Sequence, residues 1–382
     1  MADKLSKNEI WANKLLEPSG IKINGDNPWD IKIINPNFYN RVKAEGSLGL
    51  GESYMQAWWE CESLDQLFYK LFMAKIPEKI GLSLPLIFNV ISAKIFNLQA
   101  KNRAFQIGKK HYDLDNKLFS AMLGKTMAYS CGYWRNAPST RLRAGNDLDS
   151  AQNAKFDLIC RKLNLKQGQK ILDIGCGWGG FLKFAAENYK VSGLGATVSK
   201  EQADFAKKLC RGLTVEIKLQ DYRESHGKFD HVVSVGMFEH VGSKNYKIFF
   251  KTVKNCLKDD GLFLLHTIGL TTGYSNDPWI NKYIFPNGEL PFLKQIASGT
   301  EKLFIIEDLH NFGADYDKTL MAWHKNFTRN WEKLKKNYDE KFFRMWSYYL
   351  LSCAGNFRSR QTPLWQIVLS QNGIPGGYKS VR

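Results

Sequence analysis

The spacing of hydrophobic positions changes along the chain and indicates two parts, one mainly helical and one in which strands and helices alternate. In the first hundred residues apolar side chains recur mostly at helical spacing, as over Lys4–Leu16 and Leu64–Ala74. The glycine-rich run Gly46–Tyr54 predicts a turn that leads into a helix around Met55–Trp59. We therefore expect a smaller, mainly helical N-terminal domain over residues 1–105.

Strands and helices alternate in the second part of the chain. Strands are expected at 170–174, 191–196, 214–220, 231–236, 262–267 and 365–369. Helices are expected at 151–163, 181–189, 200–209 and 244–257, and the segment 317–355 is strongly helical. Parallel strands joined by crossover helices form a sheet that is covered on both faces. The pattern predicts a doubly wound, mostly parallel α/β domain over residues 151–382, with 106–150 as a linker that also covers a ligand.

The charge of the chain favours a negatively charged partner. Lysine and arginine number 54 against 37 acidic residues, a net charge of +17. Such a field attracts nucleic acid or a membrane with anionic lipid, and it does not choose between them. Eight basic residues and one acid interleave with large apolar residues over Gln66–Lys110. That mixture is typical of a helix at an anionic membrane surface, and equally of a helical subdomain whose apolar face is core.

Cysteines and apolar runs bear on metal binding and on location. The seven cysteines are scattered without a C-x-x-C pair, so we expect neither a zinc site nor a redox motif. The first residues lack the apolar segment of a signal peptide. The run Ile80–Ala93 is shorter than the roughly 20 residues that span a bilayer. These features predict a cytoplasmic protein without a transmembrane helix.

The strongest local motif is the run KILDIGCGWGG over Lys170–Gly180. A strand ends at Ile174, and the glycine turn lets the backbone approach a ligand before a helix begins. By itself such a turn could be structural or bind a dinucleotide. The run lacks the G-x-G-x-x-G pattern and instead resembles motif I of the Rossmann-like methyltransferases that use S-adenosylmethionine. Asp173, Gly175 and Gly177 match the core of that motif.

Further motifs make the resemblance specific. Together they resemble the bacterial cyclopropane-fatty-acyl-phospholipid synthases over essentially the whole chain. One departure is Arg135–Asp149, which is longer than the usual connection and which we interpret as a basic surface loop. The motifs that carry the resemblance are Gly46–Tyr54, His111–Phe119, Tyr129–Trp134, Val233–Gly242, Phe263–Gly269, Asp277–Gly288, His310–Trp323 and Cys353–Arg358.

The resemblance implies a reaction. An alkene of a phospholipid acyl chain takes the sulfonium methyl, the resulting carbocation loses a proton from that methyl, and closure gives a cyclopropane and S-adenosylhomocysteine. Such a cation needs a dry site and a nearby base. The family uses a bound bicarbonate as this base, and a charged histidine would offset its charge. The ligands carry over to Cys131, Glu239, His266, the backbone at Ile268, and Tyr316.

Without the resemblance, these residues have ordinary structural interpretations. Glu239 with His240 could be a surface pair, His266 a core histidine, and Tyr316 a loop tyrosine. Cys353 matches a cysteine that has been offered as a nucleophile. The mechanism needs no covalent enzyme intermediate, so we favour a structural or neighbouring role for Cys353.

The resemblance also implies a set of cofactor-binding residues. The strand before Thr197 ends without the usual ribose-binding carboxylate, and Gln202 follows in its place. The resemblance assigns residues to the glycine turn and to the contacts with the amino-acid end, the ribose and the adenine of S-adenosylmethionine. In chain order they are Tyr129, Ser130, Asp173, Gly175, Cys176, Gly177, Trp178, Gly179, Thr197, Gln202, Asp221 and Tyr222.

The implied partners are phospholipids with unsaturated acyl chains and an anionic membrane surface. We expect the protein on the inner face of the cytoplasmic membrane, bound peripherally, with a homodimer left open. No nucleic-acid-binding module is recognised. Three alternatives compete with this interpretation: a lipid methyltransferase that leaves a branched methyl, a nucleic-acid methyltransferase, and a membrane-binding module with an inactive methyltransferase fold.

Overall fold

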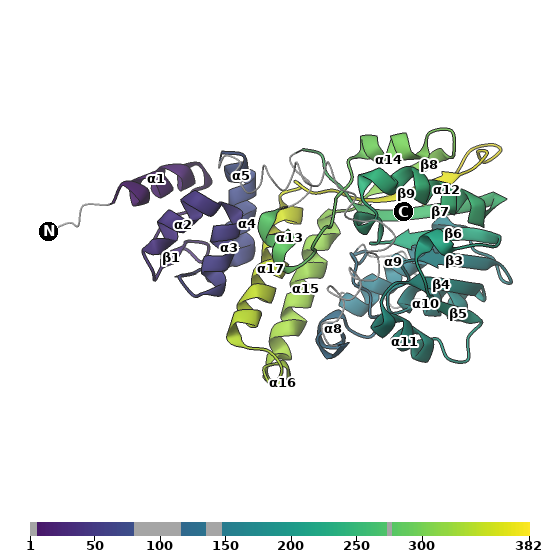
Figure 1. Cartoon of the computed structure of the whole chain (residues 1–382), viewed down its shortest axis with the longest axis horizontal. Helices are drawn as coiled ribbons and strands as arrows, with labels where there is room; N and C mark the ends of the chain where they lie inside the picture. Colours follow the sequence, from purple (N-terminus) through teal and green to yellow (C-terminus); the bar gives the residue numbers. More distant parts are fainter. Residues whose placement is uncertain (1–5, 80–115, 135–146, 273–276) are drawn as a thin grey trace.

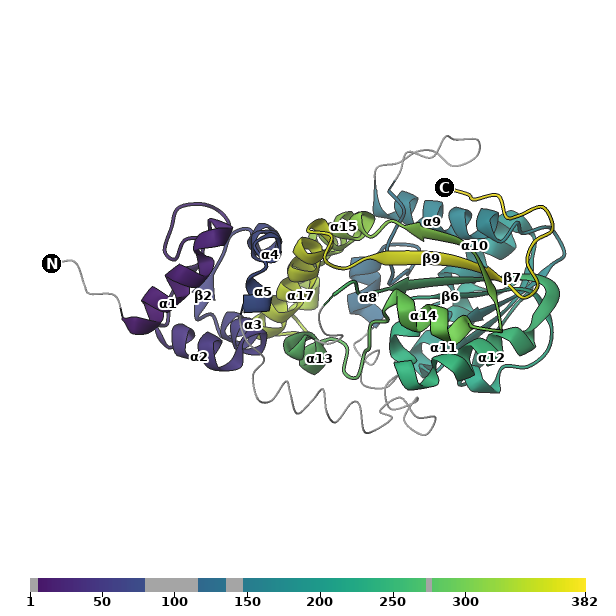
Figure 2. The same ribbon diagram turned by 90° about the horizontal axis from the view of Figure 1, so that it is seen from above.

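The computed structural model describes residues 6–79, 116–134, 147–272 and 277–382. The N-terminal helices lie at one end of the molecule and the large sheet at the other, with α15 (Ala314–Arg329) and α17 (Glu340–Arg358) between them (Figures 1 and 2). The basic segment from residue 80 onward and the Arg135–Asp149 loop up to residue 146 lie outside the described residues.

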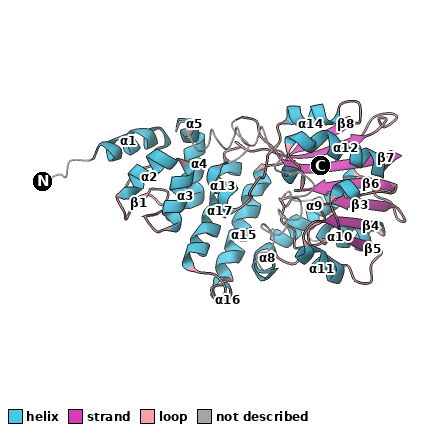
Figure 3. Cartoon of the chain, in the orientation of Figure 1, coloured by secondary structure: helices cyan, strands magenta, loops and turns pink. Residues whose placement is uncertain are grey.

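Among the described residues, the large sheet has seven strands in the order β5-β4-β3-β6-β7-β9-β8. Figure 3 shows these strands in magenta, with helices packed around them. Strands β3 to β7 run parallel, and β9 is antiparallel to both β7 and β8. The predicted α/β fold class and all six expected strands are confirmed. The strands are β3 (Lys170–Ile174), β4 (Ser192–Thr197), β5 (Val215–Leu219), β6 (Phe229–Val235), β7 (Leu257–Ile268), β8 (Ile305–Asn311) and β9 (Leu364–Ser370).

Alternate residues of each strand face opposite layers of helices. Leu264 and Val368 pack with α9, α10 and α11, whereas Phe263, Leu265 and Ile367 pack with α12 and α14. The helices are α9 (Leu148–Lys162), α10 (Gly180–Tyr189), α11 (Lys200–Leu209), α12 (Tyr246–Cys256) and α14 (Leu293–Thr300).

The first part of the chain is helical, as expected, but one prediction there is wrong. Gly46–Tyr54 is not a turn, since Ser47–Met55 forms helix α3. The expected helix at Met55–Trp59 is absent, because Trp59–Glu60 is strand β2, paired with β1 (Lys32–Ile33). The glycines serve close packing: a Cβ at Gly49 would lie 2.6 Å from the Arg41 carbonyl oxygen. The other N-terminal helices are α1 (Lys7–Leu16), α2 (Asn37–Glu45), α4 (Leu64–Met73) and α5 (Ile76–Lys79).

One hydrophobic core joins the N-terminal helices to the C-terminal ones. It contains Phe68 of α4 together with Trp346, Ala354 and Phe357 of α17. A Cβ at Gly355 would lie 2.6 Å from the Tyr69 backbone nitrogen, so α17 and α4 touch backbone to backbone. Arg358 adds an ion pair to Asp65 at 2.7 Å. The domain boundaries drawn from the sequence stay predictions, because this core crosses from one end of the chain to the other. Within the described ranges, no helix has the length and apolar character needed to cross a membrane.

Candidate functional site

The glycine turn after β3 opens a pocket at the carboxyl edge of the sheet. Gly175 and Cys176 donate their backbone N–H groups to the Ala196 carbonyl oxygen at 2.9 and 3.0 Å, which ties the turn to β4. Gly175 has φ +82°, and a Cβ there would lie 2.5 Å from the Met237 side chain. Gly177 has φ +53° and no atom within 4 Å of a built Cβ, so its α-carbon faces open space. The turn therefore leaves room for a ligand against bare backbone.

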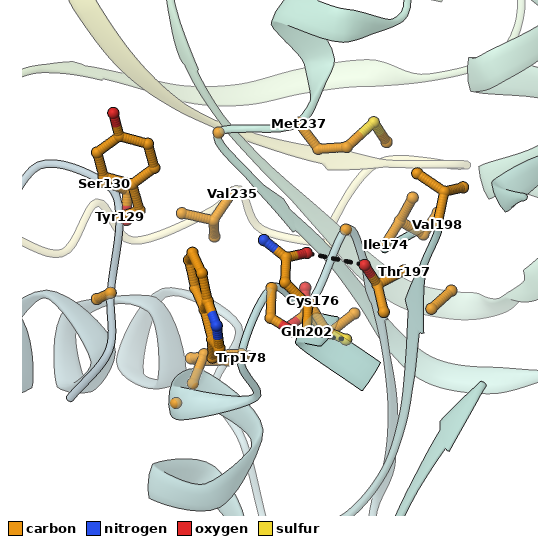
Figure 4. Close-up of a pocket in the computed structure, with 18 of the residues that line it drawn as sticks. Tyr129, Ser130, Ile174, Cys176, Trp178, Thr197, Val198, Gln202, Val235 and Met237 are labelled. Atoms are coloured by element: carbon orange, nitrogen blue, oxygen red, sulfur yellow. Dashed lines mark hydrogen bonds between the residues drawn. The ribbon is translucent and has the colours of Figure 1, made fainter. Parts of the chain in front are cut away.

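All the predicted cofactor-binding residues except Gly179 line this pocket. Thr197 donates a hydrogen bond to Gln202 at 2.9 Å on one side of it, and Tyr129 lies across from them (Figure 4). Gly179 instead packs on α11, since a Cβ there would lie 3.0 Å from the Ala206 side chain. The predicted residues that do line the pocket are Tyr129, Ser130, Asp173, Gly175, Cys176, Gly177, Trp178, Thr197, Gln202, Asp221 and Tyr222.

Asp221 and Tyr222 form the pocket wall next to β5. The Asp221 carboxylate accepts a hydrogen bond from the Arg223 backbone at 2.9 Å and pairs with its guanidinium at 3.0 Å. Tyr222 is buried, and burial raises the pKa of its phenol to about 12. These contacts fix Asp221 and Tyr222 in the pocket wall. The adenine contact expected of both residues stays a prediction.

Two buried residues of α9 were missed by the sequence analysis. Lys155 is completely buried, and its Nζ donates to Ser130 Oγ at 2.7 Å. Gln152 is equally buried and donates to the Ser130 carbonyl oxygen at 2.8 Å. Burial lowers the pKa of Lys155 to about 7 and raises the pKa of Asp173, which shares the pocket, also to about 7. In the sequence both residues look like polar positions of an ordinary amphipathic helix, and their spacing carries no signal that they are buried.

A second group of buried polar residues forms where β6 and β7 end. Strand pairing sets Val235 opposite His266, and Glu239 follows in the short 3-10 helix η4 (Phe238–His240). Glu239 Oε1 accepts a hydrogen bond from the Ile268 backbone N–H at 2.7 Å. Burial raises the pKa of Glu239 to about 7, with the Ile268 bond acting against that shift. The structure thus brings together three of the residues predicted to hold an anion.

His266 is fixed from the far side by Gln366. The two residues are paired in register between β7 and β9, and the Gln366 amide nitrogen lies 3.2 Å from His266 Nδ1. An amide that donates to Nδ1 leaves the imidazole proton on Nε2. Burial lowers the pKa of His266 well below its ordinary value, and Lys155 and Lys162 lower it further. Burial and the neighbouring lysines therefore disfavour the charged histidine expected from the sequence, and the contact with Gln366 favours a neutral ring with its N–H at Nε2.

Cys131 and Tyr316 join this group through α15. Thr319 of α15 accepts from the Gly132 backbone at 3.0 Å, and its hydroxyl lies 3.9 Å from Cys131 Sγ. Tyr316, one turn earlier on the same helix, is buried. Burial raises the pKa of its phenol well above the ordinary value, and neighbouring Cys131, Tyr129 and Glu239 raise it further. Because the charges of Cys131 and Glu239 both act on Tyr316, these residues lie in the same buried region as His266 and Ile268. We call Cys131, Glu239, His266, Ile268 and Tyr316 the acid–base cluster below.

Cys353 lies on α17 beside this cluster. Burial raises the pKa of its thiol to about 12, and the carboxyl of Asp277 adds to the shift. A nucleophilic cysteine needs the thiolate, which this environment disfavours. The position is consistent with the structural or neighbouring role that the sequence favoured.

Comparisons with known proteins agree with this geometry. The family model for mycolic acid cyclopropane synthetase matches residues 99–367. The cyclopropane-fatty-acyl-phospholipid synthase of Escherichia coli (strain K12) is 52% identical over 372 residues, covering 97% of this chain and 95% of the relative. A probable fatty acid methyltransferase of Pseudomonas putida is 39% identical over 68% of this chain and 67% of its own length.

Solved structures support the same assignment. Mycolic acid cyclopropane synthase CmaA1, complexed with SAH and CTAB, superposes with a TM-score of 0.63 at 30% identity, covering 69% of this chain and 97% of that one. The cyclopropane synthase MmaA2 from Mycobacterium tuberculosis gives a TM-score of 0.64 at 29% identity, with the same coverage of both chains. The resemblance drawn from the motifs is confirmed: the chain belongs to the mycolic acid cyclopropane synthetase family and is an S-adenosylmethionine-dependent methyltransferase.

Proposed function

We propose that the protein transfers a methylene group from S-adenosylmethionine to the cis double bond of unsaturated acyl chains in membrane phospholipids. The products are cyclopropane fatty acyl chains and S-adenosylhomocysteine. The observation that carries the proposal is the acid–base cluster beside the cofactor pocket: the Trp323 ring lies 5.2 Å from Tyr129 of the pocket and 5.9 Å from Tyr316 of the cluster, between ring centroids. This adjacency supports a methyl donor and a proton acceptor that act on the same substrate carbon.

The cluster fits a small anion that both donates and accepts hydrogen bonds. Glu239 Oε2 and His266 Nε2 are buried, and neither has a hydrogen-bond partner among the described residues. A buried polar atom without a partner is costly, so both call for a ligand. Bicarbonate matches, since its oxygens could accept from the His266 N–H and its hydroxyl could donate to the Glu239 carboxylate. Held by these two residues, it would supply a base for the proton of the transferred methyl group.

The chain's own residues set the conditions for that step. His266, held by Gln366, donates toward the cluster and cannot itself act as the base while its accepting nitrogen is occupied. Glu239 orients the ligand, and its hydrogen bond from Ile268 fixes the carboxylate plane. Cys131 and His266 are buried, at 0% and 1% exposure, which supports a site that excludes water from the reacting carbon.

Aromatic rings surround the same space. Tyr129 lies 5.2 Å from Trp323 between ring centroids, and Tyr316 stacks on Phe357 at 4.5 Å. Their faces stabilise nearby positive charge, which suits both a sulfonium and a developing carbocation. They also form an apolar lining that an acyl chain can contact without losing a hydrogen bond.

We infer that the protein docks on the anionic cytoplasmic face of the membrane to reach its substrate. In the described part of the basic segment, Met73 is 56% exposed beside Lys70, Lys75 and Lys79. Co-sedimentation of the full chain with vesicles tests this: binding should be stronger to anionic than to neutral phospholipid and should weaken with salt. Equal binding to both kinds of vesicle would contradict it. A homodimer would bind the membrane surface with higher avidity, because it carries two docking surfaces. Sedimentation velocity of the full chain tests whether the homodimer forms.

The activity is tested with S-adenosylmethionine and vesicles of monounsaturated phospholipid. Acyl chains that gain one CH₂ in mass spectrometry, with upfield cyclopropane signals in proton NMR, support the proposal. A mass gain without those signals would mean a branched methyl product instead. The base is tested in degassed buffer, where turnover should fall and return on addition of bicarbonate. Turnover that is indifferent to bicarbonate would place the base on the protein.

A further inference from the structure

The inner end of the cofactor pocket holds two buried groups of opposite charge that are not paired with each other. Lys155 and Asp173 both line the pocket, at 0% and 2% exposure. Among the residues that the structure describes, Lys155 makes one hydrogen bond, to Ser130 Oγ, and no ion pair. Asp173 Oδ1 is buried and has no hydrogen-bond partner in the same described residues. Burial leaves the pKa of each group at about 7, so a ligand group of opposite charge favours the charged form of each.

Ser130 presents the positive charge to the pocket. An ammonium group can only donate, so the 2.7 Å contact makes Ser130 Oγ the acceptor. The hydroxyl hydrogen is then left for another acceptor, and Ser130 lines the pocket. Gln152 fixes the same residue from its carbonyl side at 2.8 Å. The pocket thus contains a hydroxyl donor with a positive charge directly behind it, and hydrogen bonds that involve a charge are the stronger ones.

The resemblance already implies that Ser130 and the motif I residue Asp173 contribute to the cofactor site. We infer that Lys155, acting through Ser130, is the positioning residue for the α-carboxylate of S-adenosylmethionine. This inference rests on the proposed function for the identity of the ligand. An amino acid carries one positive and one negative group on a single carbon, and the pocket offers one partner of each sign at one end. The polarised hydroxyl suits the carboxylate, and the unpartnered Asp173 oxygen suits the ammonium.

A purely structural role for Lys155 is the alternative. Its Nζ also lies 4.5 Å from the Phe156 ring, and its charge reaches the acid–base cluster, where it lowers the pKa of His266. A structural role would affect every ligand of the pocket alike. A role in carboxylate recognition would affect only ligands that carry the amino-acid group.

The test compares two ligands by titration calorimetry on the full chain. One is S-adenosylhomocysteine; the other is 5′-methylthioadenosine, which keeps the adenosine and sulfur but lacks the amino-acid group. Lys155→Met should weaken S-adenosylhomocysteine binding by about 10- to 100-fold, the equivalent of one charged hydrogen bond, and leave methylthioadenosine within about twofold. Lys155→Arg should recover part of the loss. Ser130→Ala should likewise reduce the preference for S-adenosylhomocysteine over methylthioadenosine. This variant provides the test if Lys155→Met does not fold.

Lys162→Met is the matched control. Lys162 is also completely buried, on the same helix, but its Nζ lies 3.2 Å from His310 Nδ1, and it does not line the pocket. Its removal should leave the ratio of the two affinities unchanged. An unchanged ratio in both Lys155→Met and Ser130→Ala would overturn the inference while leaving the proposed reaction intact. Failure of the unaltered protein to bind S-adenosylhomocysteine would overturn both.

Discussion

Replacing Glu239 by glutamine should lower turnover and at the same time remove a pH-dependent penalty on stability. The new side chain can still accept from the Ile268 N–H through its amide oxygen, but it places an NH₂ donor where Oε2 now faces the cluster. One charge-assisted hydrogen bond to the bound ligand is lost, and a buried donor is left unsatisfied. Together these cost about 3 to 5 kcal/mol, which corresponds to a fall in kcat of roughly 10²- to 10⁴-fold.

The stability effect has the opposite sign. Burial raises the pKa of Glu239 from 4.5 to about 7 in the folded protein. Between these values the unfolded chain has released the proton while the folded chain still holds it, so stability falls as pH rises through this window. The shift corresponds to about 3 kcal/mol, lost fully above pH 7 or so. The glutamine variant does not titrate, and its free energy of unfolding lacks this decline.

Both effects are measured on the same two proteins. Turnover is followed with the vesicle assay, and urea unfolding is compared at about pH 4.5 and about pH 8 in degassed buffer. All other titrating groups contribute equally to the free energy of unfolding of both proteins. Their contributions therefore cancel when the pH dependence of one protein is subtracted from that of the other. Glu289→Gln is the matched control, because Glu289 donates its backbone N–H to the Glu239 carbonyl oxygen but its carboxylate caps Ser243 at 3.0 Å. Unchanged turnover in Glu239→Gln, or an equal pH dependence of stability in both proteins, would refute the reasoning.

Three further predictions concern the turn, the thiol and the helix contact. Gly177→Val should abolish S-adenosylhomocysteine binding, since φ +53° disfavours a β-branched residue and the new side chain fills the open turn; normal affinity by calorimetry would refute our placement of the cofactor. Cys353→Ser should retain turnover within about threefold, because the raised pKa leaves little thiolate; complete loss with cofactor binding intact would restore a catalytic role. Gly355→Ala should lower the free energy of unfolding by about 2 to 4 kcal/mol, because its Cβ would lie 2.6 Å from the Tyr69 nitrogen; a change below about 0.5 kcal/mol in urea unfolding would show that α4 and α17 separate freely.

The parts of the fold that follow local periodicity could be predicted from the sequence. The parallel strands are short apolar runs between amphipathic helices, and their ends were placed within a few residues. Strand β8 was missed, because it lies at the sheet edge with Ile305 and Ile306 largely exposed and shows no clear alternation. Helix α3 was missed because its glycines were interpreted as turn formers, although they allow close helix packing.

The candidate site was predictable only in part, for a different reason. The glycine turn is local in sequence, and its geometry follows from the residues themselves. Cys131, His266 and Tyr316 come from distant segments, so their meeting depends on strand register and on the packing of α15. Only the family resemblance pointed to them before the fold was known. Lys155 was missed because a buried lysine in an amphipathic helix cannot be told from an exposed one by spacing alone.

The core that joins α4 to α17 has a consequence for how the protein is made. The apolar face of α4 is complete once Met73 has been synthesised, but its partner helix begins only at Glu340. At usual rates of synthesis the interval is on the order of tens of seconds. During that time Leu67, Phe68 and Leu71, all buried in the finished protein, lack their final partner. The N-terminal helices of a nascent chain therefore cannot complete their native packing until α17 has been synthesised, and until then α17 does not cover their apolar face.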